Sequence, residues 1–200
     1  MYSKIHIQQL SGREILPYLR SLARLRVEVF RQSFCNEFRE FDQEYAYLKK
    51  HVEAKESIAI LVFSNTTLVG ASTGLPLDTE DEKIQKPLKE QGYDPSRIFY
   101  LTESVLLKEF RGRGITHHFY EMRERHAKQK KRFSLICLTY PEKISEDFPS
   151  LLHFWRKRGY VHHPDLYLVS SHKGKGMKKT YWIKSVQGED PLRRNESKKS

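Results

Sequence analysis

A glycine-rich loop with two arginines, Arg111-Gly112-Arg113-Gly114, is the part of the sequence whose residue types most suggest chemistry. Glycines let the backbone turn tightly and come close to a ligand, so that N–H groups can point outward. A helix that begins directly after such a loop adds roughly half a positive charge at its N-terminus, and arginines add forked donors. The loop therefore predicts a phosphate or pyrophosphate site, with a solvated glycine-rich turn as the alternative.

The segments on either side of the loop have the patterns of a strand and a helix. Residues 99–107 (FYLTESVLL) form the strongest strand-like run in the chain. Residues 115–129 carry Ile115, Phe119 and Met122 at spacings of 4 and 3, which is typical of an amphipathic helix. The loop is therefore expected at the junction of a strand and a helix N-terminus.

The rest of the chain alternates strands and helices. Further strands are expected over 4–10, 57–63, 67–77, 133–140, 166–171 and 179–186. Helices are expected over 19–30, 40–53 and 150–159, and the polar stretch 78–97 is expected to be an excursion outside the core. This alternation argues for an α/β fold. One domain is expected over 1–186, followed by a polar, disordered tail over 187–200.

Charge and composition narrow the class of protein. The net charge is +11, yet residues 1–100 carry 14 basic and 14 acidic side chains, whereas residues 101–200 carry 22 and 11. The excess lies in the half that holds the loop and indicates an anionic partner, such as a phosphate-bearing ligand, nucleic acid or an anionic membrane. The two distant cysteines exclude a disulfide framework, and no run approaches the ~20 apolar residues of a membrane span. A reduced, cytoplasmic protein that is not embedded in a membrane is expected.

The strand, the Arg-Gly-Arg-Gly-Ile run and the helix together resemble the acetyl-CoA-binding motif of the GCN5-related N-acetyltransferases (GNAT), Arg/Gln-x-x-Gly-x-Gly/Ala. Arg111 and Gly114 match this motif, whereas Thr116 stands where Gly or Ala is usual. The run FWRKRGY at 154–160 resembles the family's helix that ends in Gly and an aromatic residue. The order of elements also matches, and runs such as LARLRVEVFR resemble one diverse bacterial subgroup.

The resemblance implies the GNAT fold, a mixed sheet of about seven strands flanked by about four helices, in which the fourth strand splays from the fifth. It implies acetyl-CoA as co-substrate, whose pantetheine arm bonds to fourth-strand backbone at Val105, Leu106 and Leu107. The pyrophosphate would rest on the amides of Arg111, Gly112, Arg113, Gly114, Ile115 and Thr116. The reaction implied is acetyl transfer to a primary amine by direct attack in a ternary complex.

Glu103 is the candidate general base. By strand alternation it should share a face with Phe99, Leu101, Val105 and Leu107, an otherwise apolar row. A carboxylate in such a row is desolvated, which raises its pKa and makes it a better proton acceptor. Members of the family often place a Glu on this strand to deprotonate the amine. The alternative is a Glu that pairs with an arginine or is exposed at a bulge.

The general acid is less clear in the sequence. Many family members carry a Tyr four residues before the helix-ending Gly, where it protonates the departing CoA thiolate, and this sequence has Trp155 there. An indole N–H is no useful acid. Tyr140, at the end of the expected strand 133–140, is a substitute candidate, although a strand-end tyrosine is commonly just half-buried.

Two acidic clusters suggest a cationic acceptor. In the family both regions border the acceptor groove, and acidic walls would attract an amine, although ordinary surface charge is the alternative. The clusters comprise Glu37, Glu40, Asp42 and Glu44, and Asp78, Glu80, Asp81 and Glu82.

Other functions remain open from the sequence. A CoA-binding member without catalysis is one alternative, because the usual Tyr is missing. A basic nucleic-acid-binding module is a second, although the Lys-rich run 172–179 lacks interleaved aromatics. No metal is expected, because His117 and Glu121 have no third ligand at a compelling spacing. The oligomeric state is open, a homodimer included.

Overall fold

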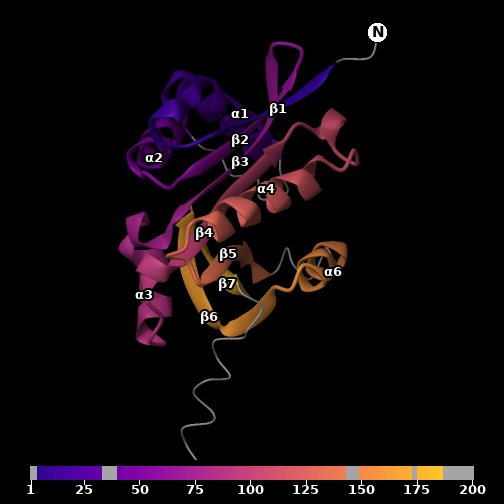
Figure 1. Ribbon diagram of the computed structural model, residues 1–200. Helices are drawn as coiled ribbons and strands as arrows, with labels where there is room; N and C mark the ends of the chain where they lie inside the picture. The colour runs from indigo at the N-terminus through magenta and orange to yellow at the C-terminus, as the bar shows by residue number, and fades with distance from the viewer. Residues whose placement is uncertain (1–3, 33–39, 143–148, 173–174, 187–200) are drawn as a thin grey trace, which may run out of the picture.

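A single mixed sheet organises the computed structural model, which describes residues 4–32, 40–142, 149–172 and 175–186 (Figure 1). The strands run in the order β1-β2-β3-β4-β5-β7-β6, and β4 and β5 are the one parallel pair. The seven strands are β1 (Ile5–Leu10), β2 (Ile58–Ser64), β3 (Thr67–Pro76), β4 (Ile98–Leu106), β5 (Leu135–Pro141), β6 (Val161–His172) and β7 (Lys175–Ser185). The expected α/β fold with a mixed seven-stranded sheet is confirmed.

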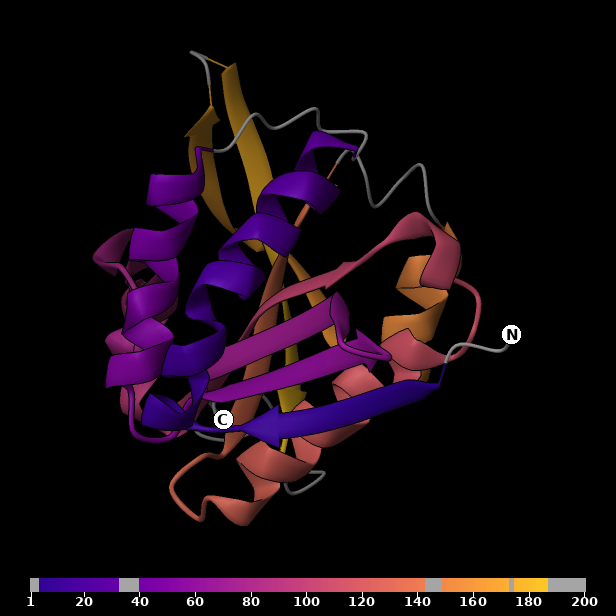
Figure 2. The ribbon, with the colours of Figure 1, turned by 90° about the horizontal axis from the view of Figure 1, so that it is seen from above.

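Five α-helices lie within the described residues: α1 (Leu19–Arg31), α2 (Phe41–Glu53), α3 (Glu82–Glu90), α4 (Ile115–Gln129) and α6 (Pro149–Lys157). Figures 1 and 2 show α1 and α2 over one face of the sheet and α4 against the other. This division follows from alternation along β2, where Ile58 and Ile60 pack toward α4 while Ala59 and Leu61 pack toward α1.

The segment 78–97, expected to lie outside the core, contributes to it instead. Leu88 on α3 is fully buried, and it packs in one cluster with Leu77, Tyr100 and Tyr181. The expectation was wrong because the segment is mostly charged and polar, and its one leucine, Leu88, together with Leu77 just before it, is enough to anchor it. Burying a leucine stabilises a fold by roughly 1.5–3 kcal/mol, which is enough to hold a short helix against a sheet.

The sheet opens between β4 and β5. These strands pair over three positions, where Ile98–Tyr100 face Leu135–Cys137, although β4 continues to Leu106 and β5 to Pro141. Beyond Tyr100 the two strands therefore diverge, and the backbone edge of each is available to a ligand. The splay expected between the fourth and fifth strands is present.

A β-bulge interrupts β4 next to the point of divergence. Ser104 pairs with Ser72 and Leu101 with Gly74, so three steps on β4 match two on β3. The extra residue shifts the alternation of side chains, as bulges do. Before the bulge Phe99 and Leu101 pack toward α4, whereas after it Val105 packs toward α1.

The tail predicted over 187–200 lies outside the described residues. Within the described part of the chain, no helix has the length and apolar character needed to cross a membrane.

Candidate active site in the cleft between β4 and β5

A cavity of about 430 Å³ occupies the opening between the diverging strands. β4 from Tyr100 to Leu106 forms one wall, and residues 138–141 of β5 form the other. Arg111 and Thr116 lie at one end of this cleft, and Val29 and Phe30 of α1 also line it. The cleft therefore connects the glycine-rich loop with the sheet face that α1 covers.

The glycine-rich loop has the backbone conformation that the sequence suggested. Gly112 and Gly114 adopt φ angles of 73° and 77°, which side chains disfavour, and nothing lies within 4 Å of a Cβ built at either. α4 begins at Ile115 directly after Gly114, with no side-chain cap on its N-terminus. The first-turn amides of Ile115 and Thr116 lack intrahelical partners, so they are free to bind an anion.

The arginines of the loop have different roles. The Arg111 amide bonds to the Lys108 carbonyl at 3.2 Å, and its side-chain Nε donates to the Leu106 carbonyl at 3.1 Å. Arg113 donates to the Glu109 carbonyl at 3.0 Å and remains exposed. Of the six loop amides predicted to hold pyrophosphate, that of Arg111 is therefore already used within the protein.

The backbone of β4 alternates between β3 and the cleft. The Leu107 amide donates to the Val69 carbonyl of β3 at 3.0 Å, and Val105, two residues earlier, points the same way. The backbone groups of Leu106 consequently face the opening, where its carbonyl already accepts from Arg111 Nε. Of Val105, Leu106 and Leu107, it is Leu106 whose backbone can meet a ligand in the cleft.

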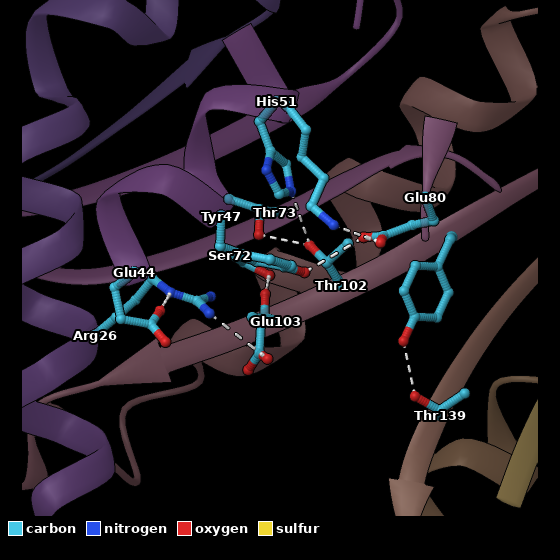
Figure 3. A network of polar contacts seen from close by, with 12 residues as sticks. Arg26, Glu44, Tyr47, His51, Ser72, Thr73, Glu80, Thr102, Glu103 and Thr139 are labelled. Atoms are coloured by element: carbon cyan, nitrogen blue, oxygen red, sulfur yellow. Dashed lines mark hydrogen bonds and ion pairs between the residues drawn. The ribbon is translucent and has the colours of Figure 1, made fainter. Parts of the chain in front are cut away.

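Glu103 lies on the cleft, but its surroundings differ from the apolar row that alternation predicted. The bulge turns both Thr102 and Glu103 toward the α1–α2 side (Figure 3). The Glu103 carboxylate is 25% exposed and lies 3.7 Å from Arg26 Nη2. Phe99 and Leu101 pack on the opposite face, whereas Val105 shares the face of Glu103, so the expected apolar row is found beyond the bulge and was wrong before it. Both features of the alternative interpretation, the arginine pair and the bulge, are present.

Arg26 is a buried residue that the sequence analysis did not single out. It is 1% exposed on α1, and its Nε contacts Glu44 of α2 at 2.5 Å. Its guanidinium also lies about 5 Å from the ring centroids of Phe30 and Tyr47. A charged residue on the buried face of a predicted amphipathic helix, next to Leu22 and Val29, was the signal that could have revealed it.

The two acidic clusters do not form the walls of the cleft. Glu44 is buried against Arg26, and Glu80 is buried against Lys50 Nζ at 2.6 Å (Figure 3). Asp78 pairs with Arg132 at 3.2 Å. Among the described residues, Glu103 is the one carboxylate in the lining of the cavity, and Glu37 lies outside the described part of the chain. The expected acidic groove is therefore not found, because Glu44 and Glu80 are partners of cations inside the fold and the other described members of the clusters lie outside the lining of the cavity.

The α2 side of the bulge is held by uncharged groups. His51 is fully buried, and its Nε2 lies 3.2 Å from Thr102 Oγ1, which lies 2.6 Å from Thr73 Oγ1. Burial, reinforced by nearby Arg26, lowers the pKa of His51 to about 3. The imidazole is therefore neutral at pH 7 and acts as a hydrogen-bonding support for β4.

Arg123, on α4, supports the bulge from the opposite face. It is 1% exposed and donates to the Thr73 carbonyl at 3.1 Å, to the Glu103 carbonyl at 3.5 Å and to Ser104 Oγ at 3.0 Å. A buried guanidinium with such bonds fixes the local backbone. Its signal in the sequence was again a charged residue on the buried face of a helix.

Three aromatic residues meet at the β5 wall of the cleft. Trp155 of α6 is buried, and its ring packs edge-on against half-buried Tyr140, with centroids 5.0 Å apart. The Trp155 indole N–H donates to the hydroxyl of Tyr120 on α4 at 2.7 Å. Tyr140 and Tyr120 both line the cavity, and Tyr120 was not predicted because the substitute for the usual tyrosine was expected at the end of the strand.

The described residues contain no cluster of three or more His, Cys, Asp or Glu side chains that could hold a metal ion. Glu121, which was considered with His117 as a ligand pair, forms an exposed ion pair with Arg125 at 2.7 Å.

No protein-family model and no curated protein sequence matches the chain. Solved structures do match its fold. An acetyltransferase of the GNAT family from Streptococcus pneumoniae has a TM-score of 0.59 at 14% identity, over 91% of this chain and 99% of that one. PaiA N-acetyltransferase from Thermoplasma acidophilum, in complex with coenzyme A, has a TM-score of 0.59 at 15% identity, over 91% and 99%. YncA from Salmonella typhimurium, with its cofactor acetyl-CoA, has a TM-score of 0.60 at 6% identity, over 91% and 94%. The chain therefore has the GNAT fold.

Proposed function

We propose that this protein is an N-acetyltransferase, which transfers the acetyl group of acetyl-CoA to a primary amine by direct attack in a ternary complex. The observation that carries the proposal is the cleft: two parallel strands diverge, and the opening ends at a glycine-rich loop and an uncapped helix N-terminus. Structures of the same fold hold coenzyme A or acetyl-CoA.

The donor half of the site fits a CoA ester. The amides of Gly112, Gly114, Ile115 and Thr116 would take the pyrophosphate, since the α4 N-terminus has no capping side chain to compete with it. Arg111 and Arg113 would add positive charge. The Leu106 backbone, which faces the cleft, would take the pantetheine arm, and Thr116 would add a hydroxyl donor where the family usually has none.

Glu103 is proposed as the base that removes the proton from the attacking amine. It is the acidic side chain in the cavity lining, and the bulge, held by Arg123 and Ser72, fixes its backbone carbonyl. Arg26 keeps a positive charge 3.7 Å from its carboxylate. A cationic acceptor would bring an ammonium group to the same carboxylate, and loss of its proton would generate the nucleophile. Positioning of amine and thioester would supply the remaining acceleration.

The test is a thermal-shift series with acetyl-CoA, longer acyl-CoAs and CoA, followed by a panel of primary amines monitored through release of free thiol from acetyl-CoA. We expect acetyl-CoA to raise the melting temperature and at least one amine to accelerate thiol release. Binding of acetyl-CoA without acetylation of any amine would instead assign a CoA-binding protein without catalysis. Salt-sensitive nucleic-acid binding that CoA does not affect would contradict both.

A further inference from the structure

Tyr120 of α4 places a phenol in the lining of the cleft from which CoA would leave. Trp155 occupies the position at which the resembling family carries its acidic tyrosine, and the Trp155 indole N–H points at the Tyr120 hydroxyl, 2.7 Å away. The Tyr120 phenol on α4 therefore contacts the side chain that stands at this position on α6. Tyr120 is 7% exposed and lines the cavity.

The environment of Tyr120 leaves its own hydrogen available. Its oxygen accepts the indole hydrogen, and among the described residues no group accepts a hydrogen bond from the Tyr120 hydroxyl. The Arg123 guanidinium lies 4.8 Å from the centroid of the ring. Burial raises the pKa of Tyr120, whereas Arg123 and the Trp155 N–H act against this rise because both stabilise the phenolate.

The order of residues along α4 matches the order of groups along the donor. Thr116, Tyr120 and Arg123 lie on one face of the helix and all line the cavity. Thr116 belongs to the phosphate end of the cleft, while Arg123 bonds to the Glu103 carbonyl at the bulge. Tyr120 therefore lies between the phosphate end and the base, where the thioester sulfur of a bound acetyl-CoA would be.

We propose that Tyr120 is a catalytic residue that protonates the sulfur of CoA as it leaves, an inference that rests on the proposed acetyltransferase function. The amine nitrogen bonds to the thioester carbon, and the C–S bond breaks with its electron pair going to sulfur. The sulfur takes the phenolic proton of Tyr120. The phenolate is stabilised by the Trp155 N–H and by Arg123, and it regains a proton from solvent, while the amine proton leaves through Glu103.

The first test measures turnover of acetyl-CoA by thiol release for wild type and three variants. Tyr120→Phe should lower kcat by about 100-fold, the lower end of the range for a lost general acid, with little change in acetyl-CoA affinity. Tyr160→Phe is the matched control, because Tyr160 is equally buried beside Tyr120 but donates its hydroxyl to Glu124 at 3.1 Å. Unchanged turnover in Tyr120→Phe, with a large loss in Tyr140→Phe, would overturn the assignment in favour of Tyr140.

A rescue variant separates chemistry from packing. Tyr120→Phe combined with Trp155→Tyr returns a phenol to the α6 position, and we expect it to recover part of the lost kcat. Melting temperatures of all variants identify any that fail to fold.

An equilibrium measurement tests the contact without turnover. Calorimetry compares CoA with desulfo-CoA, and wild type should bind CoA about fivefold more tightly, the value of one hydrogen bond to sulfur, whereas Tyr120→Phe should bind the two equally. If Tyr120→Phe keeps the preference, Tyr120 is not the donor. If wild type binds neither compound, the proposed function itself fails, and the role of Tyr120 fails with it.

Discussion

The two ends of the cleft are built in contrasting ways. The loop end consists of backbone: two glycines in the left-handed region, an uncapped helix N-terminus and the free edge of β4. The Glu103 end consists of side chains buried in pairs, in which Arg26 meets Glu44 and Lys50 meets Glu80 across different helices and loops. Local sequence determines the first kind of site, whereas long-range packing determines the second. A substitution at the loop end should therefore affect acetyl-CoA binding, whereas a substitution at the Glu103 end should affect folding or catalysis.

The largest effect is expected from Gly114→Glu at the loop end. A side chain at φ 77° strains the turn, and a carboxylate at the α4 N-terminus would repel phosphate, so acetyl-CoA binding should be abolished in calorimetry. Gly92→Glu is the matched control, because Gly92 has φ 79° and equally open surroundings outside the cleft lining. Retained affinity in Gly114→Glu would remove the loop from the donor site.

At the Glu103 end, Arg26→Met should act on folding. The variant leaves Glu44 buried without its arginine, which should lower the free energy of unfolding by about 3 kcal/mol in urea denaturation. Arg24→Met, at an exposed position on the same helix, should change it by less than about 0.5 kcal/mol. If the double variant Arg26→Met/Glu44→Leu is no more stable than Arg26→Met, the cost does not come from the loss of the arginine beside the Glu44 carboxylate.

Glu103→Gln should act on chemistry alone. Because the side chain is partly exposed and its size is kept, we expect a normal fold and normal acetyl-CoA affinity, with amine acetylation slowed by about 100-fold. Glu121→Gln, on the exposed face of α4, should acetylate like wild type. Unchanged turnover in Glu103→Gln would eliminate Glu103 as the base.

The smallest expected effect is the pH dependence of the free energy of unfolding. His51 has a pKa of about 3 in the folded protein and about 6.5 when unfolded, so the unfolded state binds the extra proton between these values. Stability should therefore fall as pH decreases below 6.5, by about 1.4 kcal/mol at pH 5.5 from this residue. Urea denaturation at pH 7.5 and 5.5 should show a weaker pH dependence in His51→Gln. If the free energy of unfolding changes equally between the two pH values in variant and wild type, His51 is not held neutral.

The sequence predicted the loop end closely and the Glu103 end poorly. The helix expected over 115–129 is α4 with the same bounds, because its apolar spacing and the glycines before it are local signals. The prediction that Glu103 shares a face with Phe99 and Leu101 was wrong because the bulge depends on the register of β4 with β3. No pattern within β4 encodes that register. The partners of Arg26 and Tyr120 lie 18 and 35 residues away, and only the folded chain brings them together.

The bulge in β4 also separates the strand into two parts that evolution or design could vary independently. Phe99 and Leu101, before the bulge, pack under α4, whereas Val105, after it, packs under α1. Substitutions at the first two positions therefore leave the packing of Val105 unaltered. Because Thr102 and Glu103 face the same side, deleting one of them would remove the bulge and leave the rows before and after it in their present layers. Such a deletion would instead remove one of two polar contacts, that of Thr102 with His51 or that of Glu103 with Arg26, so the extra residue of the bulge serves the cleft and not the hydrophobic core.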